Sequence, residues 1–235
     1  MMKSKGMDRM RVLSLALAVI ILVSFPVASW AVAITAVATG SSSPRPGSIG
    51  GTLWNGDFFI QDGAGTTNTG AGDGIDESTS WLFDFRTDSD FGSFATAAAP
   101  LATAFLTLEL TSKDSLDVTD FFRLGGLTPF GGCGTCSPVD MSLFDLPTGA
   151  TQIMQIQLLD YYTSNDLLTV FDNNFGMVSA QYGDDAIVSY ASLHLARVPE
   201  PFTILLFGVG LIGIYLAKSG RRQYMSATSS PRASV

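Results

Sequence analysis

Apolar and polar residues alternate along much of the middle of the chain. In residues 101–111, alanine or leucine occupies positions 104, 106, 108 and 110, and most of the residues between them are polar. Residues 152–160 repeat the pattern, with Met154, Ile156 and Leu158 separated by glutamines. A period of two is typical of a β-strand that buries one face. Both segments are therefore predicted to be half-buried strands.

Further segments of similar character lie between clusters of turn-forming residues. Trp81, Phe83 and Phe85 alternate in one of them, which indicates that they share a buried face. Glycine, asparagine and aspartate mark the turns, as at Asn55-Gly56. The further strand candidates are residues 52–60, 80–86, 119–124, 167–171, 176–182 and 186–196.

This pattern predicts an all-β fold. Between residues 34 and 197, no amphipathic helix of convincing length is expected, apart from a short turn near residues 160–165. About eight short strands with turns between them favour a single β-sandwich or jelly-roll-like domain over residues 52–197. The length of this segment is sufficient for one domain with its own core.

The N-terminus has the layout of a secretory signal peptide. Four basic residues within the first 11 positions precede an uncharged apolar run over residues 12–25, which Pro26 ends. Small residues favour cleavage after Ala31 or Ala33, so residues 1–33 are assigned to a signal peptide read by the Sec translocon and signal peptidase. An uncleaved signal anchor is the alternative. Residues 34–51, rich in glycine, serine and proline toward their end, are predicted to be a flexible linker.

The C-terminal part of the chain combines three features. The rigid tripeptide Pro199-Glu200-Pro201 precedes an uncharged run over residues 201–217, and the basic residues Lys218, Arg221 and Arg222 follow. The 17 residues of the run are at the short end of the roughly 17–25 that cross a bilayer as a helix. Basic residues directly after it would hold that end in the cytoplasm and place the preceding domain outside. The prolines disfavour helix before them, so the junction should be extended and open to a processing enzyme.

Val198-Pro199-Glu200-Pro201, with the apolar run and basic cluster that follow, resembles the PEP-CTERM sorting signal of Gram-negative bacteria. The resemblance covers residues 198–222. It implies that an exosortase-type membrane peptidase reads the motif, and that an inner-membrane precursor becomes a cell-surface or extracellular protein. It also implies an association with exopolysaccharide and biofilm. An ordinary single-span anchor is the alternative. Residues 223–235 extend beyond the usual end of family members and, being rich in serine and alanine, are predicted to be disordered.

The mature domain is strongly acidic. Residues 34–197 contain 19 acidic and five basic residues, a formal charge of −14, which argues against nucleic acid as a partner because phosphate binding needs clustered lysine and arginine. No cofactor is required by the pattern, although acidic residues are compatible with divalent cations. Residues 62–77 concentrate carboxylates among glycines without matching an EF-hand, so they are either calcium ligands or part of a solvated loop. These candidates are Asp62, Asp73, Asp76 and Glu77.

Cys133 and Cys136 are the only cysteines in the chain. An exported protein meets an oxidising compartment, so a local disulfide between them is expected. Because it closes a very short loop, it should contribute less stability than a long-range bridge. Free thiols, a redox site or a metal site remain as alternatives. A zinc site would need further ligands, and His194 is the only histidine.

Catalytic motifs are absent from the sequence. It contains no GxSxG nucleophile motif, no pair of metal-ligating histidines and no phosphate-binding glycine motif, so a non-enzymatic surface or matrix protein is expected. A carbohydrate-binding module is the alternative, and a glycan hydrolase follows it because the separation of two carboxylates depends on the fold. Tyr161 and Tyr162, near a turn, are the better candidates for an exposed sugar-stacking surface. The wider set of aromatic candidates is Trp54, Trp81, Phe121, Phe122, Tyr161 and Tyr162.

Overall fold

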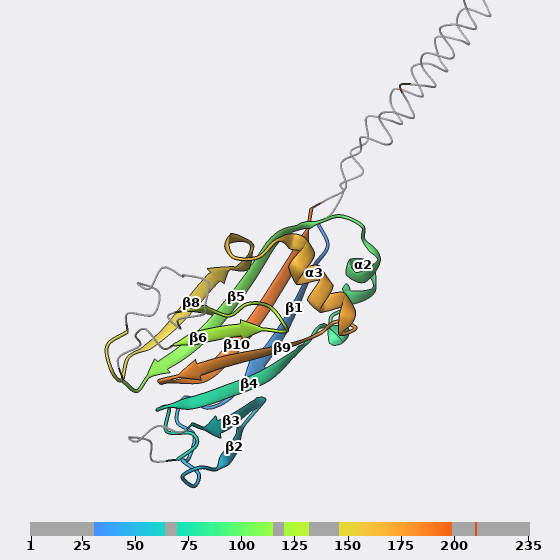
Figure 1. The fold of residues 1–235 in the computed structure, drawn as a ribbon. Helices are drawn as coiled ribbons and strands as arrows, with labels where there is room; N and C mark the ends of the chain where they lie inside the picture. The colour runs from blue at the N-terminus through green and yellow to red at the C-terminus, as the bar shows by residue number, and fades with distance from the viewer. Residues whose placement is uncertain (1–30, 64–69, 115–119, 132–145, 199–209, 211–235) are drawn as a thin grey trace, which may run out of the picture. The chain divides into compact units, whose positions relative to one another are not determined.

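The computed structural model describes residues 31–63, 70–114, 120–131 and 146–198, together with Gly210 (Figure 1). Residues 31–198 form one compact unit that is mostly β and consists of two antiparallel sheets. The prediction of an all-β fold is confirmed at this level, and the two sheets are consistent with a sandwich. Within the described residues, no helix has both the length and the apolar character needed to cross a membrane.

The first sheet has four strands in the order β1-β10-β5-β8. They span Ala33–Thr39, Ala186–Arg197, Leu101–Ser112 and Thr151–Gln157. Leu106 in β5 lies opposite Leu193 in β10 and Ile156 in β8, and all three are buried. The alternation in residues 101–111 therefore records one face turned to the core and one turned outward, as predicted.

The second sheet has six strands in the order β2-β3-β4-β9-β6-β7. They span Thr52–Asn55, Phe58–Asp62, Glu77–Asp84, Met177–Asp184, Phe121–Leu124 and Phe130–Gly131. Its inner face is aromatic: Trp81 is centred 5.4 Å from Phe58 and 5.9 Å from Phe83, both in edge-on contacts. Trp81 and Phe83 share this buried face as predicted, whereas Phe85 is buried from the 3₁₀ turn η1 (Phe85–Thr87) that follows β4.

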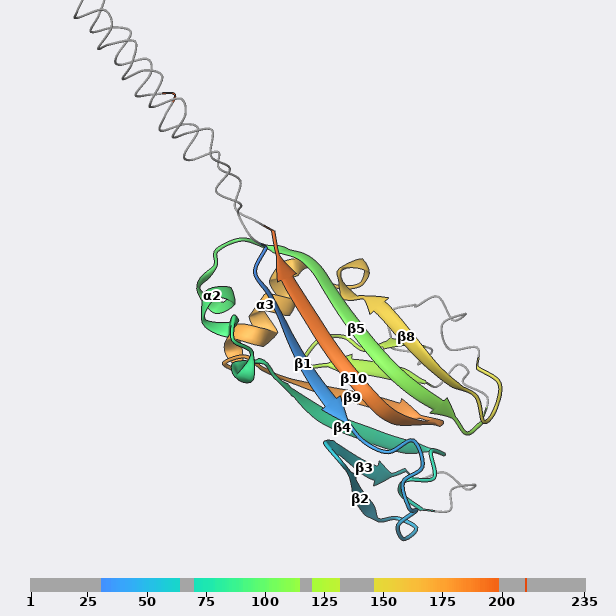
Figure 2. The same ribbon diagram turned by 180° about the vertical axis from the view of Figure 1, so that it is seen from behind.

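The core lies between the two sheets. The two sheets form two layers (Figures 1 and 2). Leucines and alanines of the four-stranded sheet meet the aromatic face of the six-stranded sheet in one cluster. Helices α2 (Phe91–Thr96) and α3 (Ser164–Asn173) lie toward one end of the sandwich (Figure 1). There the ring of Phe171 is centred 5.3 Å from that of Phe94 and 5.6 Å from that of Phe85. Truncating a buried phenylalanine of this kind to alanine costs about 3–5 kcal/mol, so these rings stabilise the end of the sandwich strongly.

The strand predicted for residues 167–171 is wrong, because these residues lie in helix α3. Its buried residues are Leu167, Val170 and Phe171, which have the spacing of one helical face rather than of a strand. Thr163 caps the helix in a capping box with Asp166, so the start of the helix is set just before the apolar run. The expectation that no helix of useful length occurs here is corrected by the same observation.

The predicted linker at residues 34–51 and the predicted strand at residues 52–60 also need correction. The linker begins with most of strand β1, in which Ile34, Ala36 and Ala38 are buried against the core while the alternate residues face outward. Residues 40–51 contain neither helix nor strand, whereas residues 52–60 contain β2 and the start of β3. The later part of segment 152–160 turns into the 3₁₀ turn η3 (Leu158–Asp160).

The two ends of this domain lie side by side, because β1 and β10 are antiparallel neighbours with Ala33 opposite Ala196 (Figure 2). The backbone N–H of Arg197 donates to the carbonyl of Val32 at 3.0 Å, and that of Val198 donates to the carbonyl of Pro100 at 3.0 Å. Backbone hydrogen bonding therefore continues to Val198, the first residue of the predicted sorting motif.

Candidate functional site

Few of the predicted sorting and disulfide residues fall within the described part of the chain. Val198 is described and is 38% exposed at the end of the folded domain. The other residues of these two predictions lie outside the described residues. They are Pro199, Glu200, Pro201, Lys218, Arg221, Arg222, Cys133 and Cys136.

Among the four calcium candidates, Glu77 is the buried one, with 3% of its surface exposed. It shares the inner face of β4 with Thr79 and Trp81, which are also buried. Its Oε2 accepts a hydrogen bond of 2.7 Å from the backbone N–H of Gly72. Burial raises the pKa of Glu77 to about 7, although hydrogen bonds from the Gly72 and Gly74 backbones oppose the rise.

The aspartates of the same loop hold its backbone in place. The Asp73 side chain accepts from the N–H of Ile75 at 2.9 Å, and the Asp62 side chain accepts from the N–H of Gly50. The N–H of Asp76 donates to Asp185 at 2.9 Å. Across the described ranges, no three acidic, histidine or cysteine side chains are grouped to hold a metal ion. Calcium binding by Asp62, Asp73, Asp76 and Glu77 stays a prediction.

The aromatic candidates separate clearly in the structure. Trp81, Phe122 and Tyr162 are buried, and Tyr161 stacks on Phe130 with ring centres 5.3 Å apart. The expectation that Tyr161-Tyr162 would offer the exposed surface is therefore wrong for Tyr162, whose hydroxyl donates to the carbonyl of Thr128 at 2.6 Å. Trp54 is the exposed candidate, at 69%.

Trp54 borders a groove of about 570 Å³. Residues from three stretches line the groove: β1, the β2–β3 hairpin, and β4 with the turn that follows it. The Trp54 ring is centred 5.0 Å from that of Phe59 on the next strand, so the hairpin supports the indole from one side. The lining residues are Thr35, Ala36, Val37, Trp54, Gly56, Asp57, Leu82, Asp84 and Thr87.

Gly56 lets the β2–β3 hairpin approach strand β1 closely. Its φ is +63°, a left-handed conformation that glycine adopts without strain, and a Cβ at this position would lie 2.2 Å from the carbonyl oxygen of Thr39. The neighbouring Asp57 accepts a hydrogen bond of 2.9 Å from the N–H of Thr39. A glycine followed by an aspartate thus ties the hairpin to the edge of the other sheet.

Strand β1 lies at the edge of its sheet, and two of the backbone N–H groups that point away from β10 donate to carboxylates. The N–H of Thr35 donates to Asp88 at 2.9 Å, and that of Thr39 donates to Asp57 at the same distance. In an antiparallel strand the N–H and C=O of one residue point to the same side, and this side alternates from residue to residue. Val37 is two residues from both Thr35 and Thr39, so its N–H and C=O point to the same open edge, beside the groove that Val37 lines. Edge strands are commonly protected by such charged groups against pairing with another chain.

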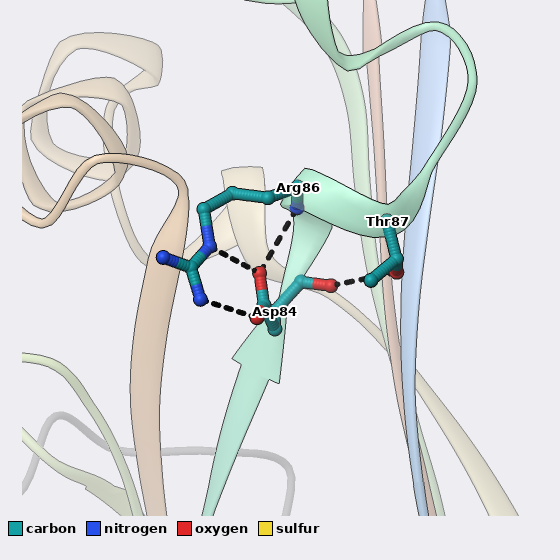
Figure 3. A network of polar contacts seen from close by, with 3 residues as sticks. All are labelled: Asp84, Arg86 and Thr87. Atoms are coloured by element: carbon teal, nitrogen blue, oxygen red, sulfur yellow. Dashed lines mark hydrogen bonds and ion pairs between the residues drawn. The ribbon is translucent and has the colours of Figure 1, made fainter.

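Asp84 forms the polar end of the groove, where Arg86 holds its carboxylate (Figure 3). The Arg86 Nη2 donates to Oδ2 at 2.6 Å, and the Nε and backbone N–H of Arg86 donate to Oδ1 at 2.8 and 3.0 Å. The hydrogen bonds of the Arg86 side chain lower the pKa of Asp84 to about 2, so this carboxylate is ionised at neutral pH. Exposed ion pairs contribute little to stability, and the pair therefore acts mainly to orient the carboxylate.

The groove combines exposed apolar side chains with polar surface that makes up the larger share of its lining. Three of the seven exposed large hydrophobic residues in the described part of the chain line it: Trp54 at 69%, Val37 at 49% and Leu82 at 48%. Apolar patches with polar surroundings commonly mark interaction sites. A tryptophan beside the Asn55-Gly56 turn was the available signal in the sequence, but the partners from β1 and β4 are visible only in the fold.

His194 does not line the groove, although it contacts Thr35, which does. Its Nδ1 and the Thr35 hydroxyl are hydrogen-bonded at 2.9 Å, and its side chain lies on the face of β10 opposite buried Leu193 and Leu195. No protein-family model matches the chain, and no curated protein matches its sequence.

Proposed function

We propose that this chain is an exported, non-enzymatic protein of the cell surface or extracellular matrix, sorted by an exosortase-type membrane peptidase. The observation that carries the proposal is the order of Val198-Pro199-Glu200-Pro201, an apolar run and a basic cluster, directly after a folded β-domain. A signal peptide at residues 1–33 would deliver the chain to the Sec translocon, and the C-terminal helix would hold the precursor in the inner membrane.

The end of the domain suits recognition of this motif. Arg197 is buried, its Nη1 donates to the carbonyl of Ala99 at 2.6 Å, and its guanidinium lies 4.6 Å from the centre of the Phe94 ring. These contacts hold the last residue of β10 to the sandwich. A proline at position 199 has no N–H and cannot extend the strand hydrogen bonding. A sorting peptidase would therefore meet its motif at the boundary of the folded domain.

Replacing Pro199-Glu200-Pro201 with three alanines tests the proposal. Insertion should be unchanged, because the rest of the apolar run and the basic cluster remain. Processing should fail, so the precursor should accumulate in the inner membrane with its C-terminal helix attached. Intact mass spectrometry of the native protein, in cells with and without the peptidase, measures the result.

Pro44-Arg45-Pro46 offers a matched control within the same chain. The same triple-alanine change there alters a Pro-X-Pro sequence far from the predicted processing point and should leave the mature mass unaffected apart from the substitution. Neutralising Lys218, Arg221 and Arg222 should instead disturb orientation in the membrane. If wild-type protein from its native host retains the residues beyond 217, the sorting proposal is wrong.

A further inference from the structure

We propose that the groove beside Trp54 binds an uncharged carbohydrate chain, with a sugar ring stacked on the indole and its hydroxyls bonded to the polar rim. This proposal goes beyond export and sorting, and it stands whether or not an exosortase processes the chain. It depends on the juxtaposition of Trp54, Val37 and Leu82 with Asp57 and Asp84 around one groove.

The exposed indole provides the first part of the argument. Large aromatic residues bury extensive surface when a protein can place them inside, as Trp81 shows in this same sheet. Trp54 instead stays 69% exposed while Phe59 supports its ring. The C–H face of a pyranose is flat and apolar, and its hydroxyls lie at the rim. A flat exposed ring with hydrogen-bonding groups beside it matches that distribution.

The polar rim provides acceptors that hydroxyl groups need. A carboxylate has two oxygens with about four lone-pair positions. Asp57 uses Oδ2 for its bonds to Thr39, which leaves Oδ1 to accept from a ligand. Asp84 is ionised and held by Arg86 in a fixed orientation. The N–H and C=O of Val37 add a donor and an acceptor.

Charge and shape select an uncharged glycan over other ligands. No lysine or arginine lines the groove, and its two carboxylates would repel acidic sugars. The nearby guanidinium of Arg86 is already paired with Asp84, which also reduces the attraction of Asp84 for a cation. An extended peptide would need the amides of Thr35 and Thr39 for a strand ladder, but Asp88 and Asp57 occupy them. The volume is within the roughly 300–1,000 Å³ of small-molecule sites.

The experiment measures binding of neutral oligosaccharides, such as β-linked and α-linked glucans and mannans, to the full-length protein by isothermal titration calorimetry. A detergent without a sugar headgroup keeps the protein soluble without competing for the site. We expect millimolar or tighter binding of at least one neutral glycan that is insensitive to salt, since no ligand charge is screened. Alginate and tetramethylammonium serve as the anionic and cationic comparisons.

Variants connect binding to the groove. Trp54→Ala should weaken binding about tenfold or more, since tryptophans at binding centres carry a large share of affinity. Trp54→Phe should retain most of it, and Asp84→Asn should weaken it several-fold by removing the charged acceptor. Phe175→Ala is the matched control, because Phe175 is an exposed aromatic residue that does not line the groove. This variant should bind the glycan as tightly as the wild type does.

Three results would overturn the proposal. The first is that no neutral glycan in the panel binds wild-type protein at millimolar concentration. The second is that Trp54→Ala binds as tightly as the wild type. The third is that only tetramethylammonium or alginate binds, with an affinity that falls as salt rises. None of these results changes the expected mass of the processed protein, so sorting and glycan binding fail separately.

Discussion

At Glu77, burial and hydrogen bonding shift the pKa of one carboxyl group in opposite directions. The side chain lies on the inner face of β4, where Oε2 accepts from the Gly72 N–H at 2.7 Å and the Gly74 backbone also faces the carboxyl. An ionised carboxylate is poorly solvated there, and the nearby Asp73 and Asp62 further disfavour its charge. Its pKa of about 7 in the folded protein, against 4.5 ordinarily, links folding to pH.

We expect wild-type stability to decrease as pH rises from about 4.5 to 7. Below pH 4.5 the Glu77 carboxyl is protonated in both the folded and the unfolded state. Above pH 4.5 it ionises first in the unfolded chain, and this ionisation lowers the free energy of the unfolded state relative to the folded state. At about 1.4 kcal/mol per pKa unit, the ionisation of Glu77 lowers the free energy of unfolding by up to about 3 kcal/mol at neutral pH. Glu77→Gln should therefore flatten the pH dependence in this window, as measured by chemical denaturation of residues 31–198.

The control is the same change at a second glutamate, Glu109→Gln, on the outward face of β5. This variant should show the same dependence of stability on pH as the wild type. Glu109 accepts from the Ser189 hydroxyl at 2.7 Å and is only partly buried. Parallel stability curves for wild type and Glu77→Gln between pH 4.5 and 7 would contradict the assignment of this dependence to Glu77.

Among the elements, α3 shows how capping and packing override local preference. The run Leu167–Phe171 is rich in residues that also favour strands, but the capping box starts a helix three residues before it. The Thr163 hydroxyl donates to the Asp166 carboxylate at 2.7 Å and accepts from the Asp166 N–H at 3.2 Å. The resulting helix places Phe171 against Phe85 and Phe94.

Thr163→Ala should therefore destabilise the domain by about 1 kcal/mol, the usual cost of losing an N-terminal cap. Thr169→Ala is the control in the same helix, because its exposed hydroxyl donates only to the Asn165 carbonyl one turn earlier. That change should stay within about 0.5 kcal/mol of the wild type. Denaturant midpoints at constant m-value measure both, and equal effects of the two changes would argue against the capping role.

For the whole molecule, the antiparallel pairing of β1 with β10 brings the N-terminal and C-terminal ends of the domain to one place. The carbonyl of Val32 accepts from the buried Arg197, and Ala33 lies opposite Ala196. Loss of Val32 and Ala33 would leave the Arg197 amide without this partner. An unsatisfied buried amide costs about 1–3 kcal/mol.

We therefore expect signal peptidase to cleave after Ala31, giving a mature chain that begins at Val32. N-terminal sequencing of the exported protein measures this directly. A mature chain beginning at Ile34 would contradict it. In a paired measurement, residues 32–198 should be more stable than residues 34–198 by about 1–3 kcal/mol.

The sequence alone determined the features that depend on neighbouring residues. Alternation along residues 101–111 and in the first part of residues 152–160 identified strands β5 and β8 and their buried faces, because successive side chains in a strand point to opposite sides. The same local rule placed Trp81 and Phe83 in the core. The signals at the two ends of the chain are likewise linear patterns, so they could be proposed without a fold.

Only the tertiary structure decided the features that depend on distant contacts. Strand β1 is a short run rich in alanine and threonine, and it becomes a strand through pairing with β10, which is more than 140 residues away. The groove joins residues 35–37, 54–57 and 82–87. Each stretch by itself is ordinary half-exposed strand or turn, and no local pattern records which ones meet. Trp54 remains exposed because its edge strand places it beside the groove, whereas Trp81 lies under the opposite sheet.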